Sequence, residues 1–459
     1  MHFDKKYLFL STSLFFKLLI NVFVIFYIAK MVSVSDFGSF TLAFIVASIT
    51  TLCLDYGFNL KGLVLSSKTK DEVNEELSSM IFSKIIIAGI AVLVFGLFFL
   101  LSKYDATTNK VIAVLAVSAI PTSFGNFYLN NFKIVNRFDK EAVGYIIQGT
   151  ILLFLLGFNH FYGQNDIFYY AIILLIARIA YMIFGFFAFR KGFFKSFTFN
   201  FKKAMVAIKT ATPFGVHLIL GASIIYIDTF ILSFLSTLEN VGLYQGGMRI
   251  IMASMLITVI ISDAFIPEIS RVYQNKPVIS KKLSNLFQFI LFFSGLTLIT
   301  IYFYKKTIIL ILFSKEYLVL EHFIVLIILI ILLRYIGIVP GIILTSLGKQ
   351  IVRARAVVVS IIFSIILNFI FIPIYGIKGA FIASFISHII LNLIYVFFAM
   401  RMINFTKGIS IHFIIITFVV YYVLQQLFFS DNRMFFIFTI VLNVIILGVY
   451  YFFQLKKRL

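Results

Sequence analysis

The chain has 459 residues, of which 62% are hydrophobic and 59 are phenylalanine, and its formal net charge is +21. Water-soluble globular proteins are usually about half apolar, so this composition favours a membrane protein. The single cysteine, Cys53, excludes an internal disulfide framework, and no spacing of cysteine and histidine suggests zinc, so we expect no cofactor.

The apolar residues are gathered into runs long enough to cross a membrane. Since 62% of 459 residues is about 285, and one membrane-spanning helix uses roughly 20 of them, about fourteen helices account for the composition. The runs lie at 7–30, 37–60, 80–101, 111–131, 143–159, 167–189, 211–235, 242–266, 284–304, 320–347, 354–375, 379–400, 409–429 and 434–454. The first run is too long for the apolar part of a signal peptide, so we expect a retained helix. We therefore predict an all-α polytopic membrane protein of about fourteen transmembrane helices.

Basic residues are distributed unequally between the two sides of the predicted helices. Of the 39 lysines and arginines, 27 fall on the side shared by both termini, 8 on the opposite side and four inside the helices. Because basic loops are retained in the cytoplasm, we expect both termini to be cytoplasmic. This asymmetry accounts for most of the net charge, so nucleic-acid binding is not needed to explain it.

The runs divide into two groups of six and a final pair. We predict an N-terminal lobe at 1–189, a basic cytoplasmic connector at 190–210, a C-terminal lobe at 211–400 and a C-terminal helix pair at 401–459. Each lobe would begin on the same side of the membrane, as parallel repeats do. A short echo supports the repeat, since after the first and seventh runs Gly38 and Gly242 each stand two residues before an aromatic residue.

Four basic side chains lie inside predicted helices, where contact with lipid would be costly. They are Lys17, Arg178, Arg249 and Arg334. Each would cost about 2.5–3.5 kcal/mol at the bilayer centre, so we expect them to face the protein interior or a water-filled cavity. Snorkelling toward the membrane surface is the alternative, above all for Arg178 and Arg249. Lys17 shares one helical face with Ser13 and Asn21, which favours a cavity.

Few acidic residues offset these bases within the predicted helices. Asp228 lies inside the seventh run, while Asp55 and Asp263 lie near helix ends. His217 shares a helical face with Asp228, so this pair, or Asp55, could couple a proton or cation to transport, or each acid could be a structural partner of a base. A net positive interior attracts anions, and a membrane-borne phosphate or diphosphate is the obvious ligand.

Uncharged polar residues form further stripes on single helical faces. The stripes are Ser118, Thr122 and Asn126; Ser360, Ser364 and Asn368; and Ser384, His388 and Asn392. We interpret them as packing and interhelical hydrogen-bonding positions, because small and amide side chains commonly serve that purpose in membranes. On this interpretation His388 is a packing residue rather than a ligand.

One stretch carries the signature of a family. Residues 368–384, Asn-Phe-Ile-Phe-Ile-Pro-Ile-Tyr-Gly-Ile-Lys-Gly-Ala-Phe-Ile-Ala-Ser, closely resemble the segment between the eleventh and twelfth helices of Wzx-type polysaccharide flippases, which belong to the multidrug/oligosaccharidyl-lipid/polysaccharide (MOP) exporter superfamily. Here Pro373 is expected to end a helix, and Gly376 and Gly379 to permit a tight turn. Further matches are Asp36-Phe-Gly38, Asp55-Tyr-Gly57-Phe, and Asp228 followed by Val241-Gly-Leu-Tyr244.

The resemblance implies a MATE-like fold, with two six-helix lobes in a V around a central cationic cavity. It implies a flippase in a bacterial cytoplasmic membrane that moves polyprenyl-diphosphate-linked oligosaccharide repeat units to the outer leaflet, for O-antigen or capsule synthesis. Membrane lipid and the polysaccharide polymerase machinery would be its partners. Lys17 and Arg249 carry over as binding residues, and position alone adds Asn21, Arg178 and Arg334. The extra C-terminal pair is similar to that of lipid II flippases, but the first two helices lack that group's multiple arginines.

Two other functions remain as alternatives. A multidrug antiporter of the same fold would export organic cations, which requires an acidic or aromatic cavity. A membrane polysaccharide polymerase or ligase would need a sizeable external loop with catalytic acids or arginines, and the outer loops predicted here are short connectors. We therefore expect a transporter rather than an enzyme.

Overall fold

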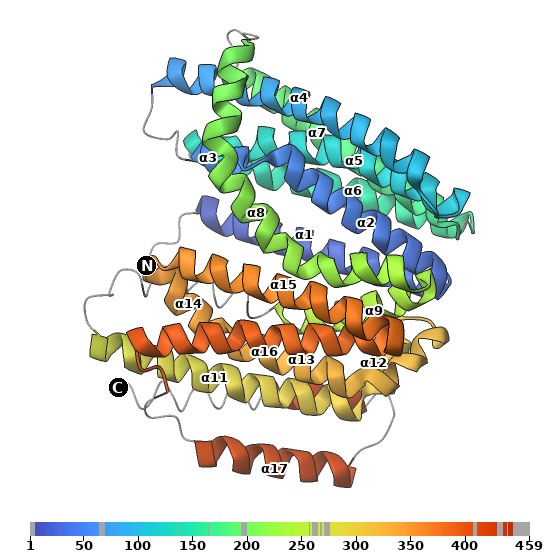
Figure 1. Ribbon diagram of the computed structural model, residues 1–459, viewed down its shortest axis with the longest axis vertical. Helices are drawn as coiled ribbons and strands as arrows, with labels where there is room; N and C mark the ends of the chain where they lie inside the picture. Colours follow the sequence, from blue (N-terminus) through green and yellow to red (C-terminus); the bar gives the residue numbers. More distant parts are fainter. Residues whose placement is uncertain are drawn as a thin grey trace. The chain divides into compact units, whose positions relative to one another are not determined.

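The computed structural model describes residues 5–63, 69–135, 137–163, 165–193, 200–256, 258, 265–266, 269, 276–406, 411–428, 435–437 and 439–443. Within these ranges the regular secondary structure consists of helices alone (Figure 1). The chain forms two compact units, Met1–Tyr226 and Ile227–Leu459, and the division falls inside a helix. The lobe boundaries expected from the grouping of the apolar runs stay predictions.

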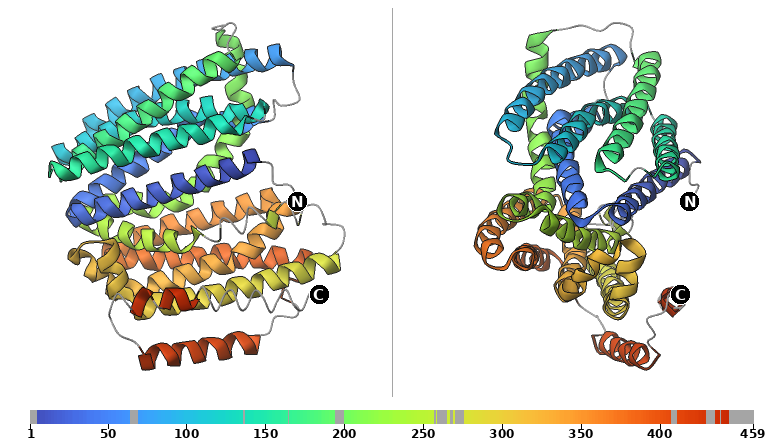
Figure 2. Two further views of the ribbon diagram at one scale, coloured as in Figure 1. Left: turned by 180° about the vertical axis from the view of Figure 1, so that it is seen from behind. Right: turned by 90° about the vertical axis from the view of Figure 1, so that its right-hand side faces the viewer.

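The first unit is a bundle of long helices. Its elements are α1 (Lys5–Met31), α2 (Val34–Asp55), the short α3 (Phe58–Leu63), α4 (Lys70–Leu101), α5 (Ala106–Asn130), the 3-10 helix η2 (Asn131–Val135), α6 (Phe138–Phe161), α7 (Ile167–Phe193) and the first part of α8 (Phe201–Leu235). The strongest packing is that of α5 against α2 and α7, while α1 lies along α6 (Figure 2). This arrangement places α5 at the centre of the first unit.

The second unit continues from the end of α8. Its elements are α9 (Leu238–Ser254), α11 (Lys276–Phe303), α12 (Lys305–Leu312), the 3-10 helix η3 (Lys315–Phe323), α13 (Ile324–Ile336), α14 (Ile338–Ser346), α15 (Gln350–Tyr375), α16 (Ile377–Met402) and α17 (Ile411–Phe428). Helices α15 and α16 lie side by side, and α16 also packs against α13. The polar stripes predicted on residues 360–368 and 384–392 therefore fall on neighbouring helices.

Ten helices of the described part are long and apolar enough to cross a membrane. They coincide with ten of the fourteen predicted runs, so the all-helical, multi-pass class is confirmed. The run at 7–30 forms α1 and the run at 409–429 forms α17, whereas the runs at 242–266 and 434–454 fall partly outside the described residues. The count of fourteen stays a prediction.

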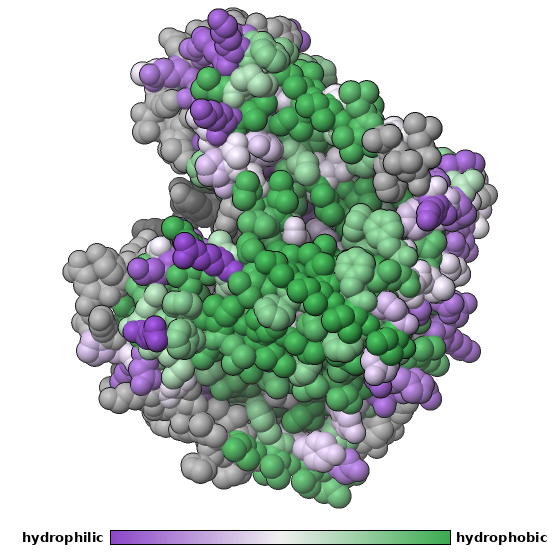
Figure 3. Space-filling model, in the orientation of Figure 1, coloured by the Kyte–Doolittle hydropathy of each residue, from purple (hydrophilic) through white to green (hydrophobic). Residues whose placement is uncertain are grey.

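Large apolar side chains cover much of the surface of these helices. Leu93 is 75% exposed, Phe154 is 71% exposed and Ile366 is 49% exposed. Figure 3 shows apolar residues across most of the coloured surface on the face that it presents. Soluble monomers rarely expose contiguous apolar patches of more than a few hundred Å², so this surface suits lipid rather than water.

Both turns of the predicted echo begin a helix. Ser33 is the N-cap of α2, because its hydroxyl oxygen accepts from the Asp36 N–H at 3.1 Å. Thr237 caps α9 in the same way, accepting from the Asn240 N–H at 3.3 Å. Side-chain caps of this kind satisfy N–H groups that have no partner within the helix.

The signature segment between α15 and α16 differs slightly from its prediction. Pro373 lies inside the last turn of α15, which ends two residues later at Tyr375 rather than at the proline. The turn is made by Gly376, whose φ is +55°. A Cβ on Gly379 would lie 2.2 Å from the Phe371 carbonyl oxygen, so the start of α16 approaches α15 more closely than any side chain allows.

Candidate functional site

A lysine and an aspartate form an ion pair in the interior of the first unit. Lys84, on α4, has no exposed surface, and its Nζ lies 3.7 Å from Asp55 Oδ1 at the end of α2. The ammonium also donates to the Leu54 carbonyl at 3.0 Å and to the Ser123 hydroxyl at 2.7 Å. The rings of Phe58, Phe124 and Phe127 lie 5.5–5.9 Å from it. Asp55 is thus the structural partner of a base.

Lys84 is not among the four basic residues predicted to lie inside the membrane. It is one of the 27 basic residues counted on the side of the termini, but it lies inside α4, whose apolar span is Glu72–Gly96. The sequence did contain a signal, because Lys84 follows Ile81-Phe82-Ser83 and precedes three isoleucines. A lysine with apolar neighbours on both sides belongs with the intramembrane bases rather than with the loops.

The Asp55-Tyr-Gly57-Phe match forms a turn that fixes the end of α2 to α8. Tyr56 adopts a left-handed conformation with φ +46°, and Gly57 follows with φ +82°. A Cβ on Gly57 would lie 2.6 Å from the backbone nitrogen of Gly215, and the Tyr56 hydroxyl lies 3.3 Å from Thr212 Oγ1. The backbones of Gly57 and Gly215 are therefore in direct contact, with no room for a side chain on Gly57. This contact fixes the position of Asp55, the last residue of α2.

Lys17 lies against an aromatic ring of α6. Its Nζ is 3.8 Å from the centroid of the Tyr145 ring, a cation–π distance. The Tyr145 hydroxyl donates to Glu141 Oε1 at 2.6 Å, and Glu141 Oε2 lies 3.0 Å from Lys133 Nζ. Asn21, the other candidate on α1, is exposed.

Arg178, on α7, points at α5. Its Nη1 donates to Ser118 Oγ at 2.5 Å, and Ser118 is fully buried. The guanidinium carbon lies 5.6 Å from the centroid of the Phe44 ring. These contacts hold Arg178 against the interior of the first unit, and its predicted role in a cavity stays a prediction. The stripe through Ser118 thus supplies a polar partner for a base as well as packing.

Asp228 is the centre of a hydrogen-bonded cluster in the second unit. The carboxylate is buried and accepts from the Tyr244 hydroxyl at 3.0 Å, from the Asn368 amide at 2.7 Å and from the Ser364 hydroxyl. These donors come from α9 and α15 and are all uncharged. Two of the family matches therefore meet here, because Asn368 opens the signature stretch and Tyr244 closes the match after Asp228.

Arg334 and His388 contact each other across α13 and α16. Arg334 Nε lies 3.2 Å from His388 Nε2, and His388 Nδ1 lies 2.7 Å from the Ser384 carbonyl oxygen. A carbonyl only accepts, so Nδ1 carries the proton and Nε2 accepts from the arginine. These contacts require a neutral imidazole, whose role is to hold Arg334.

The structure describes less of the remaining predicted residues, which are Arg249, His217 and Asp263. Arg249, on α9, is partly buried, and its Nη1 lies 3.7 Å from the Met252 sulfur. His217 lies on α8, but its side chain and all of Asp263 fall outside the described residues. Among the described residues no cluster of three or more histidines, cysteines, aspartates or glutamates could hold a metal ion.

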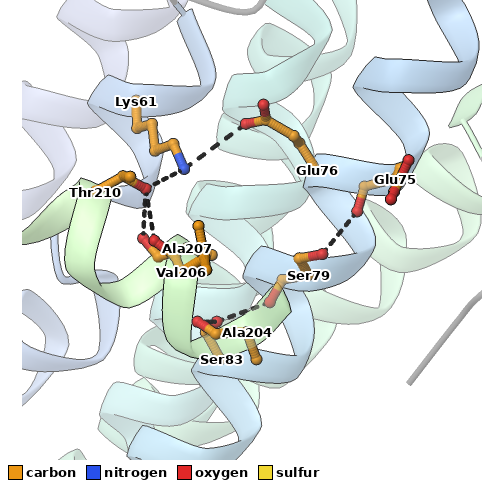
Figure 4. Close-up of polar contacts among 9 residues, drawn as sticks. All are labelled: Lys61, Glu75, Glu76, Ser79, Ser83, Ala204, Val206, Ala207 and Thr210. Atoms are coloured by element: carbon orange, nitrogen blue, oxygen red, sulfur yellow. Dashed lines mark hydrogen bonds and ion pairs between the residues drawn. The ribbon is translucent and has the colours of Figure 1, made fainter. Parts of the chain in front are cut away.

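A cavity of about 530 Å³ lies in the first unit between α3, the start of α4 and the start of α8. Both signs of charge line it, and Figure 4 shows Lys61 pointing toward Thr210 and Glu76. The Lys61 Nζ lies 2.6 Å from Thr210 Oγ1 and 3.7 Å from Glu76 Oε2. A second ion pair joins Lys203 to Glu75. The Lys61–Glu76 pair joins α3 to α4, and the Lys203–Glu75 pair joins α8 to α4. Because solvent-accessible pairs of this kind are worth about 0–1 kcal/mol each, they add little to the stability of the unit.

The fold is shared with solved transporters of the MOP superfamily. A lipid II flippase, MurJ, in an inward closed conformation matches with a TM-score of 0.74 at 19% identity, over 98% of this chain and 99% of that chain. An inward-facing multidrug resistance MATE family transporter matches with a TM-score of 0.68 at 10% identity, over 85% and 96%. A MOP superfamily transporter from Pyrococcus furiosus matches with a TM-score of 0.58 at 12% identity, over 87% and 95%. The chain is therefore a multi-pass membrane protein with the MOP transporter fold.

The family follows from the sequence comparison. A family model described as "Polysaccharide biosynthesis protein" matches residues 3–273, which is more than half of the chain. The chain belongs to the polysaccharide biosynthesis protein family, so the predicted superfamily is confirmed, as is the expectation of a transporter rather than an enzyme. No curated protein matches the chain.

Proposed function

We propose that this protein is a flippase that carries polyprenyl-diphosphate-linked oligosaccharide repeat units from the cytoplasmic to the outer leaflet of a bacterial cytoplasmic membrane. The observation that carries the proposal is the presence of basic side chains in apolar helices of a polysaccharide biosynthesis protein. Lys17 and Arg178 lie in the first unit, and Arg249 and Arg334 in the second. The product would be an O-antigen or a capsule, assembled by polymerase machinery at the outer leaflet.

The chemistry of the cargo fits these side chains. A diphosphate offers several anionic oxygens to ammonium and guanidinium donors, and such charge-assisted hydrogen bonds are about twice as strong as neutral ones. The polyprenyl tail would stay in lipid, and no covalent step is needed. An inside-negative potential would favour outward movement of the anionic diphosphate by about 2.3 kcal/mol per charge per 100 mV.

The charges also favour this function over its competitors. An organic cation antiporter needs an acidic or aromatic interior, whereas the intramembrane bases of the described residues exceed the acids in both units. The MATE structures share the fold at identities too low to argue for a shared substrate. A polymerase or ligase would need an external catalytic loop, and the described connections between helices are short.

We propose Asp228, alone or with His217, as the position where a proton or cation couples to the cycle. Its hydrogen-bond donors Tyr244, Ser364 and Asn368 are neutral, so the carboxylate keeps the capacity to gain a proton or bind a cation. Asp55 is a weaker candidate, because Lys84 already compensates its charge.

The test is transport by purified protein in proteoliposomes, with variants Lys17→Gln and Arg249→Gln. Loss of a hydrogen bond to a charged group costs about 1.5–3 kcal/mol, so we expect each variant to slow transport of a polyprenyl-diphosphate oligosaccharide roughly 10- to 100-fold. Arg137→Gln is the control, since Arg137 is half exposed and pairs with Asp139. Normal transport by the double variant at normal protein level would rule out the cationic site.

The same vesicles test coupling when a pH or sodium gradient is imposed. Asp228→Asn should abolish the effect of the gradient on the transport rate while slow, gradient-independent transport continues. Asp55→Asn should instead lower the yield of folded protein, because it leaves Lys84 without its ion-pair partner. A gradient response that survives in Asp228→Asn would assign coupling to another residue.

A further inference from the structure

The contact between Lys17 and Tyr145 joins α1 to α6. Lys17 has a long, flexible side chain, yet its ammonium lies 3.8 Å from the centre of the Tyr145 ring. The ring belongs to α6, and α6 packs along α1. One turn beyond Lys17, Ile20 reaches α6 so closely that a Cβ on Gly149 would lie 2.5 Å from its Cδ1. The two helices therefore meet at the turn that carries the contact.

The Tyr145 ring is itself held in place from two sides. Its hydroxyl donates to Glu141, which is buried and paired with Lys133. One face stacks on Tyr181, with centroids 5.9 Å apart and planes 11° from parallel. Tyr181 is fixed in turn, because its hydroxyl donates to Asn126 at 3.2 Å. A ring with a fixed hydroxyl and a stacked neighbour has little freedom to turn.

Glycines on the neighbouring helices complete this support. A Cβ on Gly125 would lie 2.5 Å from Tyr181 Cδ1, and a Cβ on Gly144 would lie 3.0 Å from Tyr181 Cε2. Tyr181 thus fills the space that these two glycines leave open. The whole arrangement resembles a platform, in which the stacked rings of Tyr145 and Tyr181 present one aromatic face to an ammonium group.

We propose that Tyr145 is a positioning residue, whose ring holds the Lys17 ammonium where it can bind the diphosphate of the cargo. The inference rests on the proposed function, and it names the Tyr145 ring as the group that positions Lys17 for binding the diphosphate. The aromatic face attracts the cation without neutralising it, whereas a carboxylate at the same place would compete with the substrate for the ammonium. Glu141 acts indirectly, because it accepts the hydrogen bond that orients the Tyr145 ring.

The experiment is a double-mutant cycle on the full-length protein in lipid nanodiscs, with undecaprenyl diphosphate as the probe and native mass spectrometry as the binding measurement. Tyr145→Leu should weaken binding about 2- to 30-fold, the range that a cation–π contact spans. In a Lys17→Gln background the same change should have no further effect, because the residue acts only through Lys17. Tyr145→Phe keeps the ring and should retain most of the affinity.

A second measurement needs no ligand. Acetic anhydride modifies lysine amines, and mass spectrometry of the Lys17 peptide reports its rate of acetylation. Removing the ring should expose the amine, so Tyr145→Leu should be acetylated faster than wild type, and Tyr145→Phe should not. Tyr128→Leu is the control, because Tyr128 is a buried tyrosine of the same unit that packs on Phe189.

The outcomes separate the inference from the function beneath it. Equal losses from Tyr145→Leu in both backgrounds, or an unchanged acetylation rate at Lys17, would show a merely structural role and overturn the inference alone. Unchanged diphosphate binding by Lys17→Gln would overturn the proposed role of Lys17, and the inference with it. Coupled binding losses together with faster acetylation would establish Tyr145 as the positioning residue.

Discussion

Single residues in this protein show two ways of keeping a charge inside a membrane. Lys84 forms an ion pair with Asp55 and donates to two neutral acceptors, so its charge is compensated within the protein. Lys17, Arg178 and Arg334 are instead held by a ring, a hydroxyl and a neutral imidazole, none of which cancels a charge. The second group contains the bases that the proposed function assigns to the anionic cargo.

Replacing Lys84 tests this distinction at the scale of one residue. Lys84→Met should destabilise the protein by about 3–5 kcal/mol, because breaking a buried pair leaves Asp55 as an uncompensated charge. The double variant Asp55→Leu with Lys84→Met should recover most of that loss, since well-packed apolar residues often replace a buried pair at little cost. Thermal unfolding in detergent, followed by size-exclusion chromatography, measures both.

The control for this prediction is Lys61→Met. Lys61 also pairs with a glutamate, Glu76, but the two side chains are 17% and 29% exposed. Its loss should cost no more than about 1 kcal/mol. Equal stabilities of the single and double variants at Lys84 would contradict the prediction, because they would show that Asp55 is no burden once Lys84 is lost.

At the scale of elements, glycines decide how closely helices and turns approach. Gly57→Ala would force a side chain onto a residue with φ +82° and place its Cβ 2.6 Å from the Gly215 nitrogen. Strained left-handed positions alone cost about 1–3 kcal/mol, and the backbone contact adds to that. We therefore expect a marked fall in unfolding temperature.

Gly89→Ala is the matched comparison. Gly89 lies in the middle of α4, and apart from its chain neighbours and the adjoining backbone of its own helix no heavy atom of the described residues lies within 4 Å of the place where its Cβ would be. Alanine is favoured over glycine inside a helix by roughly 0.5–1 kcal/mol, so this variant should be slightly stabilised. Similar unfolding temperatures for the two variants would show that the turn after α2 can rearrange.

Sequence alone could predict the helices better than the contacts between them. Ten of the long apolar runs form helices long enough to cross a membrane. They were predictable because the thickness of the bilayer sets the length of an apolar run. The polar stripe at residues 360–368 is predicted to serve packing and interhelical hydrogen bonds, and Ser364 and Asn368 do donate across helices. Their acceptor, Asp228, lies more than 130 residues earlier, and the sequence does not identify it. Periodicity shows which face of a helix is polar but not which residue faces it.

The same limit applies to the candidate site. Lys17 and Arg178 were predictable as intramembrane bases, and Ser118 as part of a polar stripe. Their contacts were not predictable, because nothing in the sequence pairs Tyr145 with Lys17 or Ser118 with Arg178. Lys84 was missed because it stands near the start of a run, where a loop charge and a buried charge look alike in sequence. Burial separates them only in three dimensions.

At the scale of the whole molecule, orientation in the membrane is testable with the protein's single cysteine. In a Cys53→Ala background, Asn200→Cys should react with a membrane-impermeant maleimide only after spheroplasts are permeabilised, because basic loops stay in the cytoplasm. Lys103→Cys should react in intact spheroplasts. Both positions are exposed, so accessibility within the fold does not limit labelling. The reverse pattern would invert the proposed topology.

The contact between Gly57 and Gly215 has a consequence for genetics. When a substitution clashes with a side chain, a second change that shrinks the neighbour can restore function. Here a Cβ on Gly57 would meet the backbone nitrogen of Gly215, and a Cβ on Gly215 would meet the carbonyl oxygen of Tyr56 at 2.9 Å. No substitution removes a backbone atom, so local suppressors of Gly57 variants are unavailable at that site. Revertants should restore glycine itself or raise stability elsewhere in the chain.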